Sequence, residues 1–174
     1  GGGYIRTYNN SGRETSYLGT GSDNSGQLRI YDKQGETRSY IGDGYLQAYN
    51  QFGERTIFLG TGTNGGGYLR TYNFSGQESI YVGTGADSSG QIRIYDNSGE
   101  TGSFLGSGYF RTYNKFGKLT TFIGNASDGG GYLRTNNKFE TETVFLGTNN
   151  ANEGLINLND KFGQSFWIRL NKKN

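Results

Sequence analysis

The 174-residue chain contains no cysteine, histidine, methionine or proline. Without cysteine and histidine it has no thiol nucleophile, no imidazole base, and few of the usual ligands of zinc, copper and haem iron. Aspartate and glutamate remain, but they recur at equivalent positions and form no singular pair of the kind that a catalytic pocket needs. We therefore predict that the protein is not an enzyme and that it holds no cofactor and no catalytic or structural metal ion.

An excess of one charge is also missing, since 17 basic residues face 15 acidic ones. This balance gives no broad electrostatic reason to expect a nucleic-acid partner. No run of about 18 apolar residues is present that would span a bilayer. A chain without cysteine and methionine has few oxidisable side chains, and a start at Gly1 fits removal of a secretion signal. We expect an extracellular, cell-surface or virion-surface protein.

Glycine and aromatic residues are abundant, with 32 Gly, 14 Tyr and 11 Phe. A glycine-rich chain of low hydropathy can be disordered, but disordered chains are poor in aromatic residues. The aromatic content of 15% therefore predicts an ordered protein with glycine at its turns.

One phrase recurs along the whole chain. It reads GGGYIRTYNNSG from Gly1, GGGYLRTYNFSG from Gly65 and GGGYLRTNNKFE from Gly129, which gives a period of 64 residues. Positions equivalent to Tyr8 follow at intervals of 23 or 18 residues: Tyr31, Tyr49, Tyr72, Tyr95, Tyr113, Asn136 and Asn159. We therefore predict a single repeat domain, 1–174, of eight 18- or 23-residue units in blocks 1–64, 65–128 and 129–174, the last of them divergent.

Each unit contains two short runs that alternate with a period of two, which is typical of strands. A turn of the form Asx-x-x-Gly joins the runs, as in Asn9 to Gly12, and only the seventh unit breaks this rule with Glu140. An Asx side chain accepts bonds from its own turn, and glycine adopts the positive φ that closes it. The second run ends with an aromatic residue, an aliphatic residue and glycine, as in Tyr17 to Gly19. The five-residue insertions of the longer units are predicted to be surface loops.

Two all-β architectures satisfy this pattern, and both are elongated and fibre-like. In a β-solenoid each unit is one coil, and equivalent residues stack about 4.8 Å apart. In a β-hairpin array each unit is a hairpin that pairs with the next. The turn chemistry favours hairpins, and so does the column of arginines, since stacked like charges repel unless acids such as Glu14 or Glu78 intervene. The solenoid remains the alternative.

The alternation places aliphatic residues on one face of the strands and a Tyr-Arg-Tyr pattern on the other. An aliphatic stripe alone is a thin core, so the aromatic face is expected to be covered by another sheet or by other copies of the chain. The predicted assembly or binding strip consists of Tyr4, Arg6, Tyr8, Arg29, Tyr31, Tyr49, Tyr68, Arg70, Tyr72, Arg93, Tyr95, Arg111, Tyr113 and Arg134. Cross-strand packing within one sheet is the alternative role, and we favour it because binding sites are usually local.

The two ends of the chain form a predicted junction between subunits. The divergent C-terminal segment could act as a cap, or it could dock the glycine-rich start of the next copy. The residues concerned are Gly1, Gly2, Gly3, Trp167, Ile168 and Leu170.

Two weaker candidates concern loops and turns. Asp23, Asp87 and Asp128 occupy equivalent loops, but one carboxylate per loop falls short of the six to eight oxygens that calcium takes. Asn9, Asn73 and Asn125 begin N-glycosylation sequons, which matter only in a eukaryotic secreted protein.

The phrases YDKQGE, YDNSGE and YNQFGE resemble the YD repeats of bacterial cell-surface and toxin-shell proteins. The longer phrase GYLRTYNFSGQ is similar to glycine-rich repeats in bacterial surface proteins and phage-type tail fibres. The resemblance implies long sheets of hairpins and carries over no active site. We expect a structural subunit of an extracellular fibre or filament, with copies of itself as partners in a homopolymer or homotrimer. The alternative is an adhesin or tail-fibre shaft that binds polysaccharide or another surface.

Overall fold

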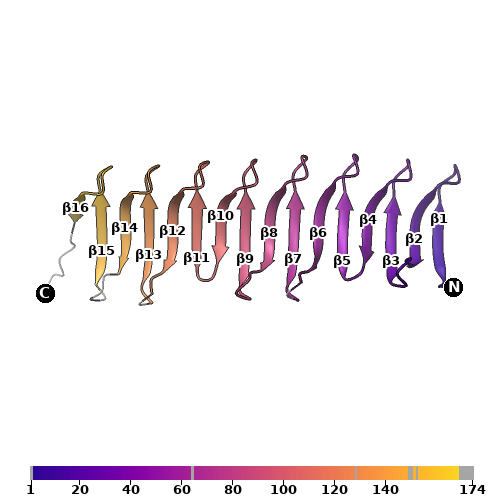
Figure 1. Cartoon of the computed structure of the whole chain (residues 1–174), viewed down its shortest axis with the longest axis horizontal. Coiled ribbons are helices and arrows are strands. Elements are labelled where there is room, and N and C mark those ends of the chain that lie inside the picture. The colour runs from indigo at the N-terminus through magenta and orange to yellow at the C-terminus, as the bar shows by residue number, and fades with distance from the viewer. Residues whose placement is uncertain (1, 64, 128, 149–150, 152, 169–174) are drawn as a thin grey trace. The chain divides into compact units, whose positions relative to one another are not determined.

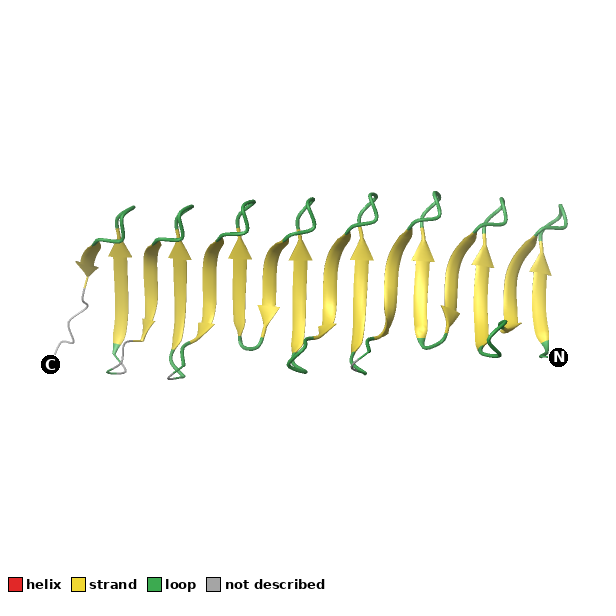
Figure 2. Cartoon of the chain, in the orientation of Figure 1, coloured by secondary structure: helices red, strands yellow, loops and turns green. Residues whose placement is uncertain are grey.

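The computed structural model describes residues 2–63, 65–127, 129–148, 151 and 153–168. These residues form sixteen β-strands joined by turns and loops, and no helix occurs among them (Figure 2). The chain divides into two compact halves, Gly1–Ser88 and Ser89–Asn174. We call them the first unit and the second unit, as distinct from the eight 18- or 23-residue repeat units. The predicted all-β class is confirmed.

The first unit is an open antiparallel sheet whose strands lie in the order of the sequence (Figure 1). Each strand pairs with the next one along the chain. The strands are β1 (Tyr4–Tyr8), β2 (Glu14–Thr20), β3 (Gly26–Tyr31), β4 (Thr37–Gly42), β5 (Tyr45–Tyr49), β6 (Arg55–Thr61), β7 (Gly67–Tyr72) and β8 (Glu78–Thr84).

The second unit repeats this topology. Its strands are β9 (Gly90–Tyr95), β10 (Thr101–Gly106), β11 (Tyr109–Tyr113), β12 (Leu119–Asn125), β13 (Gly131–Asn136), β14 (Glu142–Thr148), β15 (Gly154–Asn159) and β16 (Ser165–Ile168). Because consecutive strands are antiparallel neighbours, the hairpin array is confirmed and the β-solenoid alternative is wrong.

The Asx turns join the two strands of each repeat in the way their sequence predicts. Asn9 Oδ1 accepts the amides of Ser11 and Arg13, both at 3.0 Å, and the equivalent Asx residue does the same in each of the other turns. Gly12 has a φ of 76°. Glu140 adopts a φ of 65° in the seventh turn, and its amide still donates to Asn137 O at 3.0 Å. The turn therefore persists without glycine.

A β-bulge follows almost every one of these turns. In the first hairpin Thr7 faces Ser16 but Tyr8 faces Glu14, which leaves Thr15 as the extra residue. The same shift occurs in every hairpin that an Asx turn closes, except β15–β16. The bulge turns Glu14 onto the face that carries Arg6, a placement that strict alternation does not predict.

The opposite ends of the strands are joined in two ways, which explains the two unit lengths. The short units use two-residue turns, Asp43-Gly44 and Ser107-Gly108, in which all four residues have positive φ. This is the geometry of a type I′ hairpin. The long units carry a loop instead, such as the one closed by the Gly21 amide donating to Ser25 O at 2.7 Å. The insertions are therefore loops, as predicted.

Candidate site on the aromatic face

The predicted Tyr and Arg residues share one side of each sheet, which we call the aromatic face. Its pattern follows from the strand register, in which Tyr4 faces Gly19, Arg6 faces Tyr17 and Tyr8 faces Glu14. Three rows result. The first row contains Tyr4 and Tyr68; the second Arg6, Arg29, Arg70, Arg93, Arg111 and Arg134; the third Tyr8, Tyr31, Tyr49, Tyr72, Tyr95 and Tyr113.

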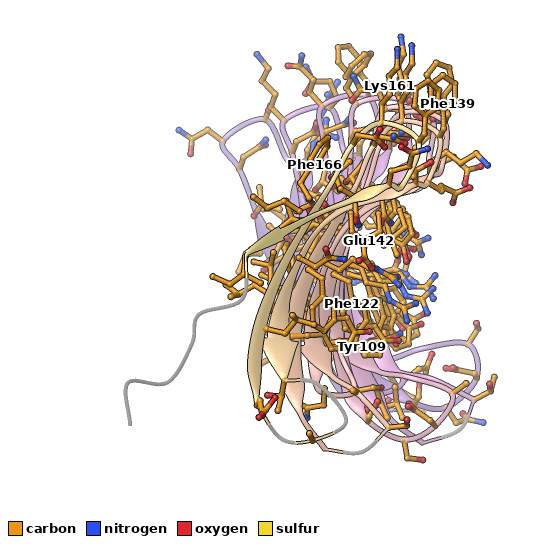
Figure 3. The ribbon with its side chains drawn as sticks, turned by 90° about the vertical axis from the view of Figure 1, so that its left-hand side faces the viewer. Tyr109, Phe122, Phe139, Glu142, Lys161 and Phe166 are labelled. Atoms are coloured by element: carbon orange, nitrogen blue, oxygen red, sulfur yellow. The ribbon has the colours of Figure 1, made fainter. Side chains whose placement is uncertain are left out.

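Aromatic rings from successive strands stack along this face. In the second unit the ring centroids of Tyr109 and Phe122 are 5.6 Å apart, and those of Phe122 and Tyr132 are 4.7 Å apart. Phe58 and Tyr68 stack at 5.2 Å in the first unit. Figure 3 shows Tyr109 and Phe122 together, on the same side of the ribbon as Glu142. We call this row of stacked rings the aromatic ladder, and its offset geometry is a favourable one for aromatic pairs.

Glycine makes room for the aromatic ladder. A Cβ atom on Gly124 would lie 2.5 Å from Tyr109 Cβ, and one on Gly147 would lie 2.5 Å from Tyr132 Cβ and 3.1 Å from the Phe145 ring. Each glycine faces a tyrosine across the strands, at the position that Tyr4 holds in the first repeat, and at Gly147 the Phe145 ring two residues earlier lies over the glycine. The aromatic, aliphatic, glycine ending of each unit is thereby explained by packing.

The arginines lie over the rings. The guanidinium carbon of Arg111 is 4.2 Å from the Tyr109 ring centroid and 5.3 Å from that of Phe122. Arg6 lies 4.7 Å from Tyr4. Because the arginines occur on alternate strands, neighbouring guanidinium groups are about 9.6 Å apart with aromatic rings between them. The repulsion expected in a single-coil stack is therefore reduced, and cation–π attraction adds to the packing.

One gap in the arginine row is filled by a residue that the repeat pattern does not single out. Strand β5 carries Gln47 at a position where six of the eight repeats carry arginine, and Arg55 from β6 reaches over instead. Its guanidinium carbon lies 5.4 Å from the Phe58 ring and 4.6 Å from the Tyr72 ring. The available signal was that arginine stands at a position where three other repeats carry glutamate, namely Glu14, Glu78 and Glu142.

Acidic partners of the arginine row are present in the first unit. Arg6 pairs with Glu14 at 3.5 Å and Arg70 pairs with Glu78 at 3.4 Å, as the sequence predicts. In the second unit, the described residues form no ion pair with Arg93, Arg111 or Arg134. The Nε atoms of these three arginines are buried and lack hydrogen-bond partners among those residues.

A hollow of about 410 Å³ opens on the aromatic face of the second unit. Its lining combines two cationic groups, one carboxylate and three aromatic rings. The residues are Arg93, Glu100, Thr101, Phe104, Tyr109, Arg111, Tyr113 and Gly117. Planar cations beside ring faces suit a sugar or another flat polar group.

Local contacts shift the pKa of Tyr40 on the aromatic face and of two aspartates in the turns and loops, Asp96 and Asp23. Burial, with Tyr45 and Asp43 nearby, raises the pKa of Tyr40 to about 12. Hydrogen bonds from the Ser98 hydroxyl and amide lower the pKa of Asp96, and Ser25 acts in the same way on Asp23. Asp23 thus serves as a loop acceptor, while Asp128 lies outside the described residues.

Neither a metal cluster nor a membrane helix is found in the described part of the chain. No group of three or more Asp or Glu side chains is placed there to hold a metal ion. Nor does any helix in it have the length and apolar character needed to cross a membrane.

The residues of the predicted junction are only partly described. Gly2 packs against β2, since a Cβ atom on it would lie 2.2 Å from Thr20 Oγ1, and Gly3 has open space beside it. The backbones of Trp167 and Ile168 pair in β16 with Asn157 and Ile156. Gly1 and Leu170 lie outside the described residues.

The other side of each sheet, which we call the aliphatic face, is bare. Ile123 is 45% exposed, whereas the adjacent Phe122 on the aromatic face is 6% exposed. The large exposed residues of this face are Ile5, Leu18, Ile30, Ile41, Ile57, Leu59, Ile80 and Val82 in the first unit, and Ile92, Ile94, Leu105, Ile123, Leu146, Leu158 and Phe166 in the second. The sequence indicated that the aromatic face would need a cover, but the structure leaves more apolar surface on the aliphatic one.

Comparisons with known proteins assign the chain to no family. No family model and no curated protein matches it. Among solved structures, the Tc holotoxin pore of Photorhabdus luminescens matches with a TM-score of 0.26 and 13% sequence identity. The match covers 89% of this chain and 12% of that one, so this chain spans a small part of the toxin chain's length. The chain is a repetitive sheet of antiparallel β-hairpins.

Proposed function

We propose that the protein is a structural subunit of an extracellular fibre or filament, built by association of identical chains through their aliphatic faces. The observation that carries this proposal is the bare row of aliphatic side chains, of which Leu18, Leu59 and Leu105 are each about half exposed (51%, 50% and 49%). Soluble monomers rarely leave a contiguous apolar surface of this kind in water, since its burial is favourable.

A second copy of the chain is the partner that fits this face. Each unit presents the same aliphatic pattern, so two copies can lay aliphatic face on aliphatic face with their sheets about 10 Å apart. A sheet of eight strands, five residues long, covers roughly 600 Å². Contact between two such faces removes roughly 1,200 Å² from water, which reaches the size of stable interfaces.

The test measures the mass of the particle by light scattering and its form by electron microscopy. The variant carries Leu59→Lys on β6 and Val82→Lys on β8, which place two charges on the aliphatic face of the first unit. The wild-type chain is expected to form dimers or longer assemblies as its concentration rises, and the variant is expected to stay monomeric. The matched control, Gln51→Lys, adds a charge at an exposed turn and is expected to assemble like the wild type.

Two outcomes would contradict the proposal. A wild-type chain that stays monomeric at all concentrations has no homomeric contact. Assembly that persists in the Leu59→Lys/Val82→Lys variant, with strand content unchanged by circular dichroism, would place the contact elsewhere than on the aliphatic face.

A second candidate function is an adhesin or tail-fibre shaft that binds polysaccharide on the aromatic face. The hollow around Arg93 and Arg111 favours it, because aromatic walls lie there beside two cationic groups that form no ion pair with any described residue. Glycan-array binding that Arg111→Gln removes, with assembly intact, would support this function. Glycan binding that is equal in the variant would exclude that hollow as the binding site.

A further inference from the structure

Three consecutive turns of the second unit expose a phenylalanine beside a lysine. They join β11 to β12, β13 to β14 and β15 to β16, so they lie at the same edge of that unit. The Phe side chains are 71%, 73% and 73% exposed. We call the set the Lys-Phe ridge: Lys115, Phe116, Lys138, Phe139, Lys161 and Phe162. Figure 3 shows Phe139 and Lys161 projecting together beyond the ends of the strands.

The ridge is held as one ordered edge. Lys118 Nζ lies 2.6 Å from Glu140 Oε2, which links the first turn to the second. Asn137 Nδ2 donates to Lys161 O at 3.1 Å, which links the second turn to the third. With two strands per hairpin, successive tips are about 9.6 Å apart. The rings are therefore presented together at a regular spacing.

The charge of the ridge is positive and open to solvent. The ammonium groups of Lys115, Lys138 and Lys161 lie 5.1, 5.0 and 4.8 Å from the centroids of the adjacent Phe rings. None of these three lysines forms an ion pair with a described residue. Glu140 is already paired with Lys118, and Asp160 Oδ1 accepts two turn amides.

The turns of the first unit lack this combination. Lys33 is followed by Gln34, Phe52 is preceded by Gln51, and Phe74 lies between Asn73 and Ser75. Phe52 and Phe74 are nevertheless exposed, at 77% and 87%. The first unit therefore has the same kind of turn with phenylalanine but no lysine, or with lysine but no phenylalanine.

We propose that the Lys-Phe ridge docks on the surface of a lipid bilayer that carries anionic headgroups. The phenylalanine rings enter the apolar boundary of the bilayer, while the lysine ammonium groups stay at the headgroups and contact their phosphates. A soluble polyanion would satisfy the lysines but leave the three rings in water. A bilayer supplies an apolar phase and negative charge at once, and both are needed to match the ridge.

The test is co-sedimentation of the full chain with vesicles of phosphatidylglycerol and phosphatidylcholine. Each lysine near such a surface contributes to binding, so the variant K115Q/K138Q/K161Q is expected to bind roughly a hundredfold more weakly. The variant F116S/F139S/F162S is expected to bind more weakly as well. Added salt and vesicles of phosphatidylcholine alone should both reduce wild-type binding.

The matched control is Lys33→Gln with Phe52→Ser and Phe74→Ser, which makes the same kinds of change in the first unit. It is expected to bind as the wild type does, and all variants keep the Asx acceptors of their turns. Binding that is equal on uncharged vesicles, unchanged in the lysine variant, or lost equally in the control would overturn the proposal. Equally strong, ridge-dependent binding to dextran sulfate would replace the bilayer with an acidic polysaccharide.

Discussion

At the scale of single residues, the aromatic ladder depends on glycine at every position where a ring lies over the neighbouring strand. Gly124 lies so close to Tyr109 that even a methyl group would collide with its side chain and backbone. Glycine in a strand normally weakens it, but here the overlying ring replaces the missing side chain. The glycine content of this chain is therefore partly a requirement of packing and only partly one of turns.

Replacing Gly124 with alanine tests this requirement. We expect Gly124→Ala to lower the free energy of unfolding by about 1–3 kcal/mol, because the new Cβ overpacks the site. The measurement is urea unfolding followed by circular dichroism. Gly131→Ala is the matched control, since a Cβ there meets nothing within 4 Å. It should change stability by less than about 1 kcal/mol, in the stabilising direction. Equal effects at the two positions would contradict the packing argument.

The phenol of Tyr40 provides a second prediction at this scale. Its pKa is raised from 10.0 to about 12, first by burial and then by Tyr45 and Asp43 nearby. The unfolded chain loses this proton before the folded chain does, so stability is expected to fall as pH rises from about 10 to about 12. The measurement is an absorbance titration of tyrosinate in the wild-type chain and in Tyr40→Phe. The variant should lack one phenol that the wild-type chain titrates near pH 12. If the phenol that the variant lacks is one that titrates near pH 10 in the wild-type chain, the raised pKa would be contradicted.

At the scale of the hairpin, the Asx turn sets the register of the two strands. Asn73 Oδ1 accepts the amides of Ser75 and Gln77 at 2.9 and 3.0 Å. We expect Asn73→Ala to lower the free energy of unfolding by about 1–2 kcal/mol, since both bonds are lost. Ser75→Ala is the control, and it should cost less than about 0.5 kcal/mol. Thermal unfolding of the two variants measures both changes in stability. If Asn73→Ala leaves the stability unchanged, glycine alone closes the turn.

The sequence was sufficient to predict the hairpins and insufficient to predict which face of the sheet leaves more apolar surface exposed. The turns were predictable because the interactions of residues such as Asn73 and Gly76 are local. The bulge at Thr15 was not, because it shifts the register without a distinctive residue type. Arg55 was missed because its role depends on Gln47 of the adjacent strand. The strip of Tyr and Arg was placed on one face correctly, but its role in assembly remains a prediction.

At the scale of the whole molecule, the uncovered aliphatic face should control how the protein responds to salts. If association is hydrophobic, ammonium sulfate is expected to strengthen it and urea to weaken it, whereas sodium chloride should not dissociate it. Sedimentation velocity at fixed protein concentration measures this response. Dissociation by moderate sodium chloride would instead indicate that ion pairs hold the copies together.

The two edges of each sheet differ in how much change they can accept. Register is fixed at the Asx edge, while the opposite edge already alternates between two-residue turns and loops such as the one from Gly21 to Ser25. Because loop closure costs grow slowly with length, a foreign peptide inserted in such a loop should leave the strand pairing intact. The sequences of the loops at this edge can therefore vary, or be replaced by engineering, while the strands of the sheet stay the same.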